Sequence, residues 1–133
     1  MAEDKMFVLM VEDDLVLRNV AGKYLSQKFN AVCVMNGHSA RAETAKQVPD
    51  AILIDIMLPD IDGFQLLEGW RKDTKFDNTA MIMFTNLSET FDRTKAEELG
   101  ADAYYIKADV DVAELPTIIE KHIKKRRKKG WFS

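Results

Sequence analysis

The feature that most constrains the fold is a run of four apolar residues, 51–54, that ends directly at the carboxylate of Asp55. Because successive positions are apolar, both faces of the corresponding strand have to be buried, which is typical of a parallel sheet covered by helices. A loop that contains proline and glycine follows at residues 57–63. A parallel strand brings its last side chain to the carboxyl edge of the sheet, where open α/β folds place their sites. Asp55 is therefore a candidate functional residue.

The rest of the chain alternates between strand and helix patterns. Short apolar runs predict strands at residues 6–12, 31–35, 51–55, 80–84 and 103–106. Periodic apolar positions predict helices at residues 15–25, about 39–47, from 63 onward, 89–99 and from about 111 onward, and residues 72–79 are predicted to be a loop. Asp14 is the expected N-cap of the first helix, and Gly100 is expected to end the fourth. Repeated strand–helix units imply parallel strands with right-handed crossovers, and hence an α/β sandwich with helices on both faces of one sheet.

Length and composition limit the classes of protein that fit. A chain of 133 residues is expected to form one domain, and a hydrophobic content of 47 % excludes disorder as the default state. The first apolar run, residues 6–11, is too short for a signal peptide or a membrane span. Cys33 is the single cysteine, which excludes an intrachain disulfide and favours a reducing, cytoplasmic compartment.

Charge is distributed unevenly along the chain. Residues 121–133 hold seven basic and no acidic side chains, so the net charge of −3 divides into +7 there and −10 in residues 1–120. Because residues 1–120 are this acidic, they are a poor candidate for binding nucleic acid through their own surface and a good candidate for binding a cation. The basic segment is either a solvated helix end that leads into a linker, or a patch for an acidic partner, nucleic acid or an anionic membrane.

Polar side chains stand where the predicted strands end. They are Glu12, Asp13 and Asp14 after the first strand, Asp55 after the third, Thr85 after the fourth and Lys107 after the fifth. Carboxylates that meet at one sheet edge repel each other unless a cation joins them, and a small set of oxygen ligands suits Mg²⁺. A lysine and a hydroxyl are the groups that a bound phosphoryl group needs, and a carboxylate can itself accept a phosphoryl group.

Five pieces of the sequence, in this order, resemble response regulator receiver domains of two-component signalling, in particular stand-alone chemotaxis-type regulators. The pieces are residues 8–14, 52–63, 83–85, 100–104 and 106–107. The resemblance covers about residues 5–123 and implies a flavodoxin-like, doubly wound, five-stranded parallel sheet of order 2-1-3-4-5. It predicts a receiver domain at residues 1–123 and leaves residues 124–133 as a basic tail.

The resemblance also implies a role for each pocket residue. Asp55 would be the phosphoacceptor, and Lys107 would pair with its carboxylate or with the phosphoryl oxygens. Asp13 would ligate Mg²⁺ directly, with Glu12 acting through water and the backbone carbonyl of Met57 completing the set. The phosphoryl donor would be a phosphohistidine on a sensor histidine kinase or a histidine phosphotransfer protein.

A conformational switch is implied as well. Thr85 would move toward the phosphoryl group, and Tyr104 would follow it inward, changing a partner-binding surface around the fourth and fifth helices and the fifth strand. The downstream partner is not named by the sequence, and self-association into a homodimer on phosphorylation is one form that the output could take.

The chain departs from the family pattern at three points. Ala108 stands where many members have proline after the lysine, so the geometry of that peptide bond is left open. Asn86 replaces a small residue after the threonine and could narrow access to Asp55. Met57 and Leu87, at the two positions that influence attack by water on the phosphoryl group, are both apolar, which predicts slow self-dephosphorylation.

Two other classes of function fit the sequence less well than the signalling switch. An aspartate-nucleophile phosphatase needs a second aspartate two residues after the nucleophile, where Met57 stands, so a turnover enzyme is disfavoured. A pseudo-receiver, which binds partners without phosphorylation, remains the alternative, although the complete set of pocket residues argues against it.

Overall fold

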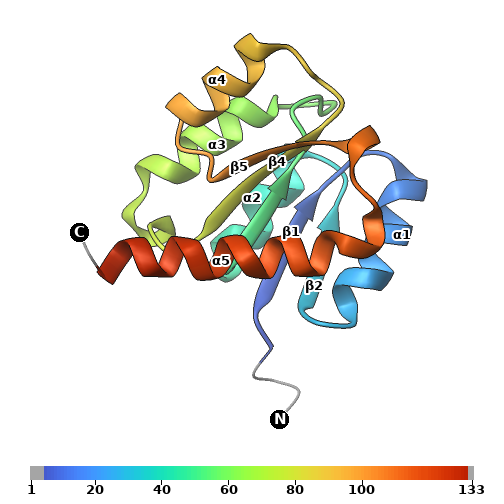
Figure 1. Cartoon of the computed structure of the whole chain (residues 1–133), viewed down its shortest axis with the longest axis horizontal. Coiled ribbons are helices and arrows are strands. Elements are labelled where there is room, and N and C mark those ends of the chain that lie inside the picture. Colours follow the sequence, from blue (N-terminus) through green and yellow to red (C-terminus); the bar gives the residue numbers. More distant parts are fainter. Residues whose placement is uncertain (1–4, 132–133) are drawn as a thin grey trace.

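The computed structural model describes residues 5–131 and shows one parallel sheet. Its strands are β1 (Phe7–Val11), β2 (Asn30–Val34), β3 (Ala51–Ile54), β4 (Ala80–Thr85) and β5 (Ala103–Ile106). They lie in the order β2-β1-β3-β4-β5, and every neighbouring pair is parallel (Figure 1). The predicted fold class and strand order are confirmed.

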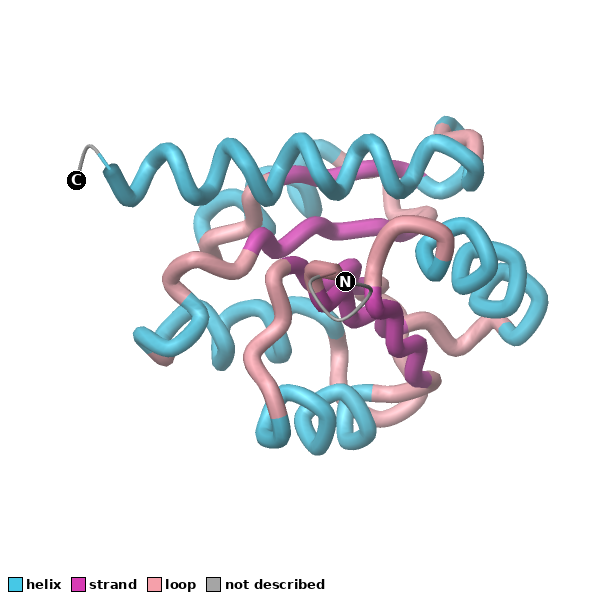
Figure 2. The backbone as a smooth tube through the Cα atoms, turned by 90° about the horizontal axis from the view of Figure 1, so that it is seen from below, coloured by secondary structure: helices cyan, strands magenta, loops and turns pink. Residues whose placement is uncertain are grey.

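Helices cover both faces of this sheet. They are α1 (Leu15–Ser26), α2 (Gly37–Lys46), α3 (Gly63–Lys72), α4 (Thr90–Glu98) and α5 (Leu115–Trp131), with 3₁₀ turns η2 (Thr74–Phe76), η3 (Lys107–Asp109) and η4 (Val112–Glu114). Figure 2 shows the strands between the two helical layers. None of the described helices combines the length and apolar character needed to cross a bilayer.

The apolar strand runs explain the two layers. All residues of β1, β3 and β4 are buried, and alternate residues belong to different cores. Leu9 packs in the core beneath α2, α3 and α4, whereas Met10 packs in the core beneath α1 and α5. Side chains of a strand point alternately to its two faces, so a run of consecutive apolar residues is what a sheet covered on both sides requires.

Most predicted element boundaries agree with the structure within two residues. Asp14 caps α1 by accepting a hydrogen bond from the Leu17 amide at 3.1 Å, and Gly100 follows α4 with a positive φ of 103°. The last helix was expected near Asp111, but that residue caps the 3₁₀ turn η4, and α5 begins at Leu115. Pro116 accounts for this start, because proline fits the first turn of a helix, where no partner for its missing N–H is needed.

The predicted loop at residues 72–79 was partly wrong. It contains η2, whose Phe76 is buried beside Trp70 with 6.3 Å between the ring centroids. A single apolar residue in a polar segment carries no periodicity, so the sequence pattern did not predict this contact.

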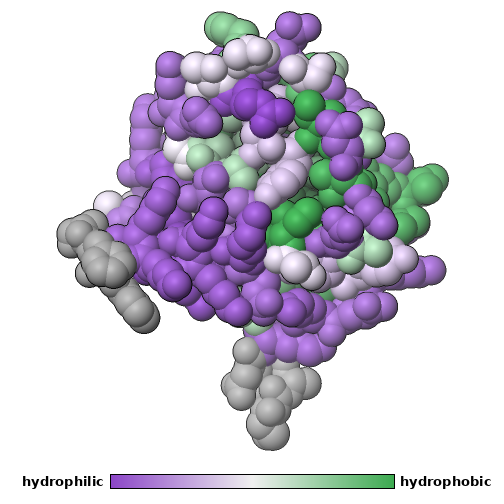
Figure 3. Space-filling model, in the orientation of Figure 1, coloured by the Kyte–Doolittle hydropathy of each residue, from purple (hydrophilic) through white to green (hydrophobic). Residues whose placement is uncertain are grey.

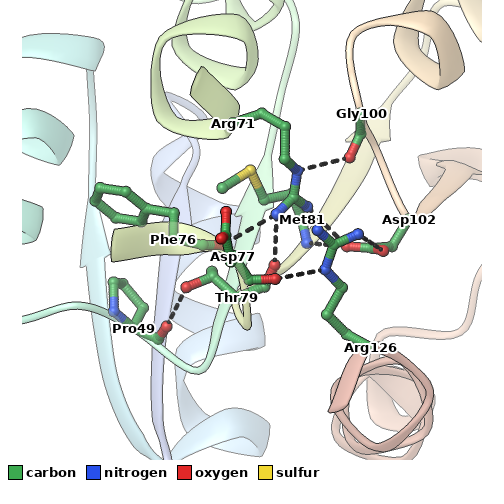
Figure 4. A network of polar contacts seen from close by, with 9 residues as sticks. All are labelled: Pro49, Arg71, Phe76, Asp77, Thr79, Met81, Gly100, Asp102 and Arg126. Atoms are coloured by element: carbon green, nitrogen blue, oxygen red, sulfur yellow. Dashed lines mark hydrogen bonds and ion pairs between the residues drawn. The ribbon is translucent and has the colours of Figure 1, made fainter. Parts of the chain in front are cut away.

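An ion-pair network at the amino edge of the sheet holds α3, β5 and α5 together (Figure 4). The Asp102 carboxylate accepts hydrogen bonds from Arg71 at 2.9 Å and from Arg126 at 3.1 Å, and also from the Met81 amide at 2.8 Å. Arg71 donates in addition to the carbonyl of Gly100 at 2.9 Å. Because the side chains of Asp102 and Arg71 are only 8 % and 14 % exposed, the pair is largely shielded from water.

The network generates a stability prediction. Replacing Asp102→Asn removes the charge that balances Arg71 and leaves a buried guanidinium without its partner, so we expect the free energy of unfolding to fall by about 3 kcal/mol. Urea unfolding followed by circular dichroism measures the loss. The matched control is Asp77→Asn, because only the backbone carbonyl of Asp77 takes part in the network. Equal stability of the two variants would contradict the assignment.

Candidate functional site

The polar strand ends meet in one open pocket at the carboxyl edge of the sheet. The register aligns the ends of neighbouring strands, with Val11 beside Ile54 and Ile54 beside Met83. The pocket has a volume of about 410 Å³ and is lined by Glu12, Asp13, Asp14, Asp55, Met57, Thr85, Asn86 and Lys107. The structure thus brings together the acidic residues, the threonine and the lysine that the sequence singled out.

The ammonium group of Lys107 lies between two buried carboxylates. Its Nζ donates a hydrogen bond to Asp55 Oδ2 at 2.7 Å and lies 2.6 Å from Glu12 Oε1. The contact with Glu12 is an ion pair that is not aligned as a hydrogen bond, so Glu12 Oε1 is buried without a hydrogen-bond donor among the described residues. The other oxygen, Glu12 Oε2, accepts from the Asp14 amide at 3.1 Å.

Burial and pairing act on the two ends of this contact in different ways. Burial raises the pKa of Glu12, and the nearby Lys107 and the Asp14 amide offset this only in part. For Lys107, burial would lower the pKa, but the close contacts of its ammonium group with the carboxylates of Asp55 and Glu12 outweigh burial and raise the pKa above its usual value. Lys107 therefore stays charged, and its single positive charge faces more than one carboxylate.

The excess of carboxylate fits a hard divalent cation. One oxygen each from Glu12, Asp13 and Asp55 lie within 4.8 Å of one another, although exposed acidic groups also cluster without a metal. Glu12 Oε1 provides the second observation, because its one close cation is the Lys107 ammonium at 2.6 Å and it has no aligned hydrogen-bond donor among the described residues, so it can also accept from a metal-bound water. Asp13 is exposed at the pocket mouth, as expected for Mg²⁺, which keeps several of its waters.

The loop between β3 and α3 is held in place over the pocket. The Met57 amide donates to Asp55 Oδ1 at 3.3 Å, and Met57 itself is 66 % exposed. Gly63 closes the loop against β3, because a Cβ there would lie 2.3 Å from the carbonyl oxygen of Asp55. The proposed role of the Met57 carbonyl as a metal ligand stays a prediction.

Asp60, to which the sequence gave no role, ties this loop to α2. Its carboxylate accepts from the amides of Gly37 at 2.8 Å and His38 at 2.9 Å. Partial desolvation would raise the pKa of Asp60, but these backbone hydrogen bonds and that of the Ile61 amide outweigh it and lower the pKa to about 2. Nothing in the sequence pattern indicated that a carboxylate so distant in the chain binds the first amides of α2.

Thr85 and Tyr104 are joined through the backbone of Leu87. Thr85 is buried at the end of β4, and its Oγ1 accepts from the Leu87 amide at 3.4 Å. The hydroxyl of Tyr104 donates to the Leu87 carbonyl at 2.7 Å, and the ring is 9 % exposed, packed in the core beneath α4. Arg93 of α4 covers the ring at 5.0 Å from its centroid.

The neighbouring tyrosine faces the other side of the sheet. The Tyr105 hydroxyl lies 2.7 Å from Nε2 of the buried His122 on α5. The structure therefore separates the two adjacent tyrosines, which the sequence could not do: only Tyr104 contacts the segment that follows Thr85. The peptide bond between Lys107 and Ala108, left open above, is trans.

A doubly wound α/β domain with three carboxylates, a threonine and a lysine at its carboxyl edge defines a class of proteins, and comparison with known proteins identifies the family. A family model described as "Response regulator receiver domain" matches residues 8–120. The chain therefore belongs to the response regulator receiver family, whose general function is phosphorylation-based switching in two-component systems and whose members bind Mg²⁺ at acidic residues.

Curated relatives include full-length regulators and a shorter protein. The probable transcriptional regulator ycf29 of Porphyra purpurea is 36 % identical over 85 % of this chain and 54 % of its own length. Protein PilG of Pseudomonas aeruginosa is 29 % identical over 78 % of each chain. The chain spans about half the length of the curated transcriptional regulators that it matches.

Solved structures agree on the fold. A CheY-like response regulator receiver domain protein from Methanospirillum hungatei is 23 % identical, with a TM-score of 0.84 over 95 % of this chain and 99 % of that one. The BeF3-activated N-terminal receiver domain of Klebsiella pneumoniae RstA is 27 % identical, with a TM-score of 0.78 over 88 % and 97 % of the two chains.

The position of Lys107 generates a prediction about metal binding. In Lys107→Met the buried carboxylates lose their counter-charge, so we expect the free energy of unfolding without divalent cations to fall by about 3 kcal/mol. Mg²⁺ should then stabilise the variant more than it stabilises the unchanged protein, because the metal takes over the role of the ammonium. Urea unfolding in chelator and in Mg²⁺ measures both effects.

The control for this experiment is Lys72→Met, which removes an exposed lysine far from the pocket. An increment from Mg²⁺ that is the same in both variants would show that Lys107 and the metal do not share ligands.

Proposed function

We propose that Asp55 accepts a phosphoryl group from a phosphohistidine of a sensor histidine kinase or histidine phosphotransfer protein. The observation that carries this proposal is the Asp55 carboxylate itself, 5 % exposed and held at 2.7 Å by Lys107 among acidic groups that fit a cation. A carboxylate oxygen of Asp55 would attack phosphorus while the bond from phosphorus to the histidine nitrogen breaks, and the imidazole leaves with its electron pair. The domain would act in the cytoplasm.

The chain's own residues would orient and neutralise the transferred group. Lys107 would pair first with the Asp55 carboxylate and then with the oxygens of the transferred phosphoryl group, because its flexible ammonium group acts as a point charge. Asp13 and Asp55 would hold Mg²⁺ directly, with Glu12 acting through water and the Met57 carbonyl completing the set. When bound, Mg²⁺ neutralises charge on the phosphoryl oxygens.

The switch would run from Asp55 to Tyr104 through Thr85 and Leu87. A phosphoryl group adds about −1.5 to −2 charge and strong acceptor oxygens, toward which the Thr85 hydroxyl would turn. Because that hydroxyl now accepts from the Leu87 amide, its movement would release a segment whose carbonyl holds Tyr104. Phosphorylation would thereby change the α4–β5–α5 face and its binding of a downstream partner or of a second copy.

Receiver domains are phosphoacceptors that dephosphorylate themselves, so we propose a signalling switch without turnover of a separate substrate. The pseudo-receiver alternative is less well supported, because one pocket holds the acceptor Asp55 together with Glu12, Asp13, Thr85 and Lys107, the full set that phosphorylation requires.

The proposal is tested by labelling with a small acyl phosphate in Mg²⁺, followed by intact mass measurement. The unchanged protein should gain one phosphoryl group, and Asp55→Asn should gain none. Asp109→Asn, which alters an exposed carboxylate near the pocket, should be labelled normally. Failure to label the unchanged protein would favour the pseudo-receiver, and labelling of Asp55→Asn would place the acceptor elsewhere.

We also predict a long-lived phosphorylated state. Met57 and Leu87 offer no polar side chain to orient a water molecule for attack, so phosphate loss should take minutes or longer. Met57→Asn should shorten the lifetime about tenfold, which corresponds to about 1.4 kcal/mol of activation free energy. Decay in Mg²⁺ after removal of the donor can be followed on phosphate-affinity gels.

Met35→Asn is the matched control, since Met35 is 53 % exposed and does not line the pocket. Loss of phosphate from the unchanged protein within seconds would contradict the proposal of slow hydrolysis.

A further inference from the structure

The basic segment near the C-terminus divides into two groups of side chains. Both arginines face the body of the protein: Arg126 bonds to Asp102 and to the carbonyl of Asp77 at 2.8 Å, and Arg127 pairs with Asp50. The lysines are all exposed; they are Lys121, Lys124, Lys125, Lys128 and Lys129, here called the lysine surface. The arginines thus attach this part of α5 to the domain, and the lysines are available to bind something else.

The lysine surface points away from the sheet. Ile119, His122 and Ile123 are buried and mark the inner side of α5. At 100° per residue, Lys121, Lys124 and Lys128 lie on the opposite side of the helix, and Lys125 and Lys129 lie on one flank. From Lys121 to Lys129 the helix rises about 12 Å. Figures 1 and 3, in the same orientation, show α5 crossing the outside of the molecule and a hydrophilic surface over its C-terminal half.

The acidic pocket does not cancel this charge, because it lies at the other edge of the sheet. The acids paired with Arg126 and Arg127 are Asp102 and Asp50, which stand just before β5 and β3 at the amino edge, whereas Asp55 follows β3 at the carboxyl edge. Among the described residues, the one ion pair of the lysine surface is a contact of 3.9 Å between Lys124 and Glu120. A partner on this surface would leave the pocket open.

A groove beside the helix offers room for small anionic groups. It has a volume of about 380 Å³ and is lined by Asp102, His122, Lys125, Arg126, Lys128 and Lys129. Its single acid, Asp102, is already paired with Arg71 and Arg126. Lys125 and Lys129 stand one helical turn apart along it, so a phosphate group between them would meet two ammonium groups.

We propose that the lysine surface binds the phosphate headgroups of anionic phospholipids and so docks the domain on a membrane. A cluster of four to eight basic side chains on a helix is typical of binding to anionic lipids. The lysine surface lies along an outer helix, where a flat bilayer can approach it. In the sequence, Trp131 and Phe132 follow Lys129 after one glycine, and these residue types favour the membrane interface.

Nucleic acid and an acidic protein fit these observations less well. Proteins that bind nucleic acid combine lysine with arginine or amide side chains that contact phosphates and bases. Both arginines of this segment are instead paired with aspartates. An acidic protein partner would bury a surface with apolar anchors, whereas the exposed side chains among residues 121–129 of α5 are all basic.

The test is sedimentation of the full chain with vesicles at low salt. We expect binding to vesicles of phosphatidylcholine and phosphatidylglycerol and no binding to phosphatidylcholine alone. Replacing Lys121, Lys125, Lys128 and Lys129 by glutamine should lower the partition coefficient about a hundredfold or more. The matched control replaces the exposed lysines Lys23, Lys46, Lys72 and Lys75 by glutamine and should change it less than about tenfold.

Three outcomes would overturn the proposal. The first is no binding of the unchanged protein to anionic vesicles at low salt. The second is equal loss in the two glutamine variants, which would indicate a net-charge effect. The third is tighter binding to duplex DNA or to polyglutamate than to vesicles at equal concentrations of negative charge, which would assign the surface to another class of partner. Unchanged circular dichroism and labelling of Asp55 show that the variants remain folded.

Discussion

The site depends on one contact, the ammonium of Lys107 between Asp55 and Glu12. It joins the ends of β1, β3 and β5, and it can form only because the parallel register brings those ends to the same edge. One positive charge does not balance the carboxylates gathered there, and an oxygen of Glu12 is left without a hydrogen bond. A pocket left short of positive charge attracts a metal ion and tolerates a new phosphoryl group beside it.

The opposite edge of the sheet shows how a buried aspartate behaves when its charge is fully paired. Asp102 accepts hydrogen bonds from two arginines and a backbone amide, and these contacts link α3, β4 and α5 to the start of β5. The carboxyl edge keeps its acids incompletely paired, and the loops there are fixed from behind by Asp60 and Gly63. The paired residues that stabilise the fold and the pocket residues therefore lie at opposite edges of one sheet, and α5 runs along the outside between the two edges.

Consecutive apolar residues predicted the buried strands, and the residues that follow those strands predicted the pocket, because strand direction alone brings them together. Contacts between distant segments were beyond the pattern: Asp60 caps a helix that starts 23 residues earlier, and Phe76 is buried from within a polar segment. Adjacent tyrosines look alike in a sequence, but alternation along β5 sends Tyr104 to one core and Tyr105 to the other. The basic segment looked uniform, and only the fold separates its paired arginines from its exposed lysines.

In the mechanism that we propose, a charge placed on Asp55 is transmitted through Thr85 and Leu87 to Tyr104. Hydrogen exchange of the backbone amides, measured with and without phosphorylation in Mg²⁺, is the decisive experiment. We expect faster exchange of the Leu87 amide, which loses its acceptor Thr85, together with altered exchange around Tyr104. Phosphorylation of Asp55 that leaves exchange at both positions unchanged would contradict it.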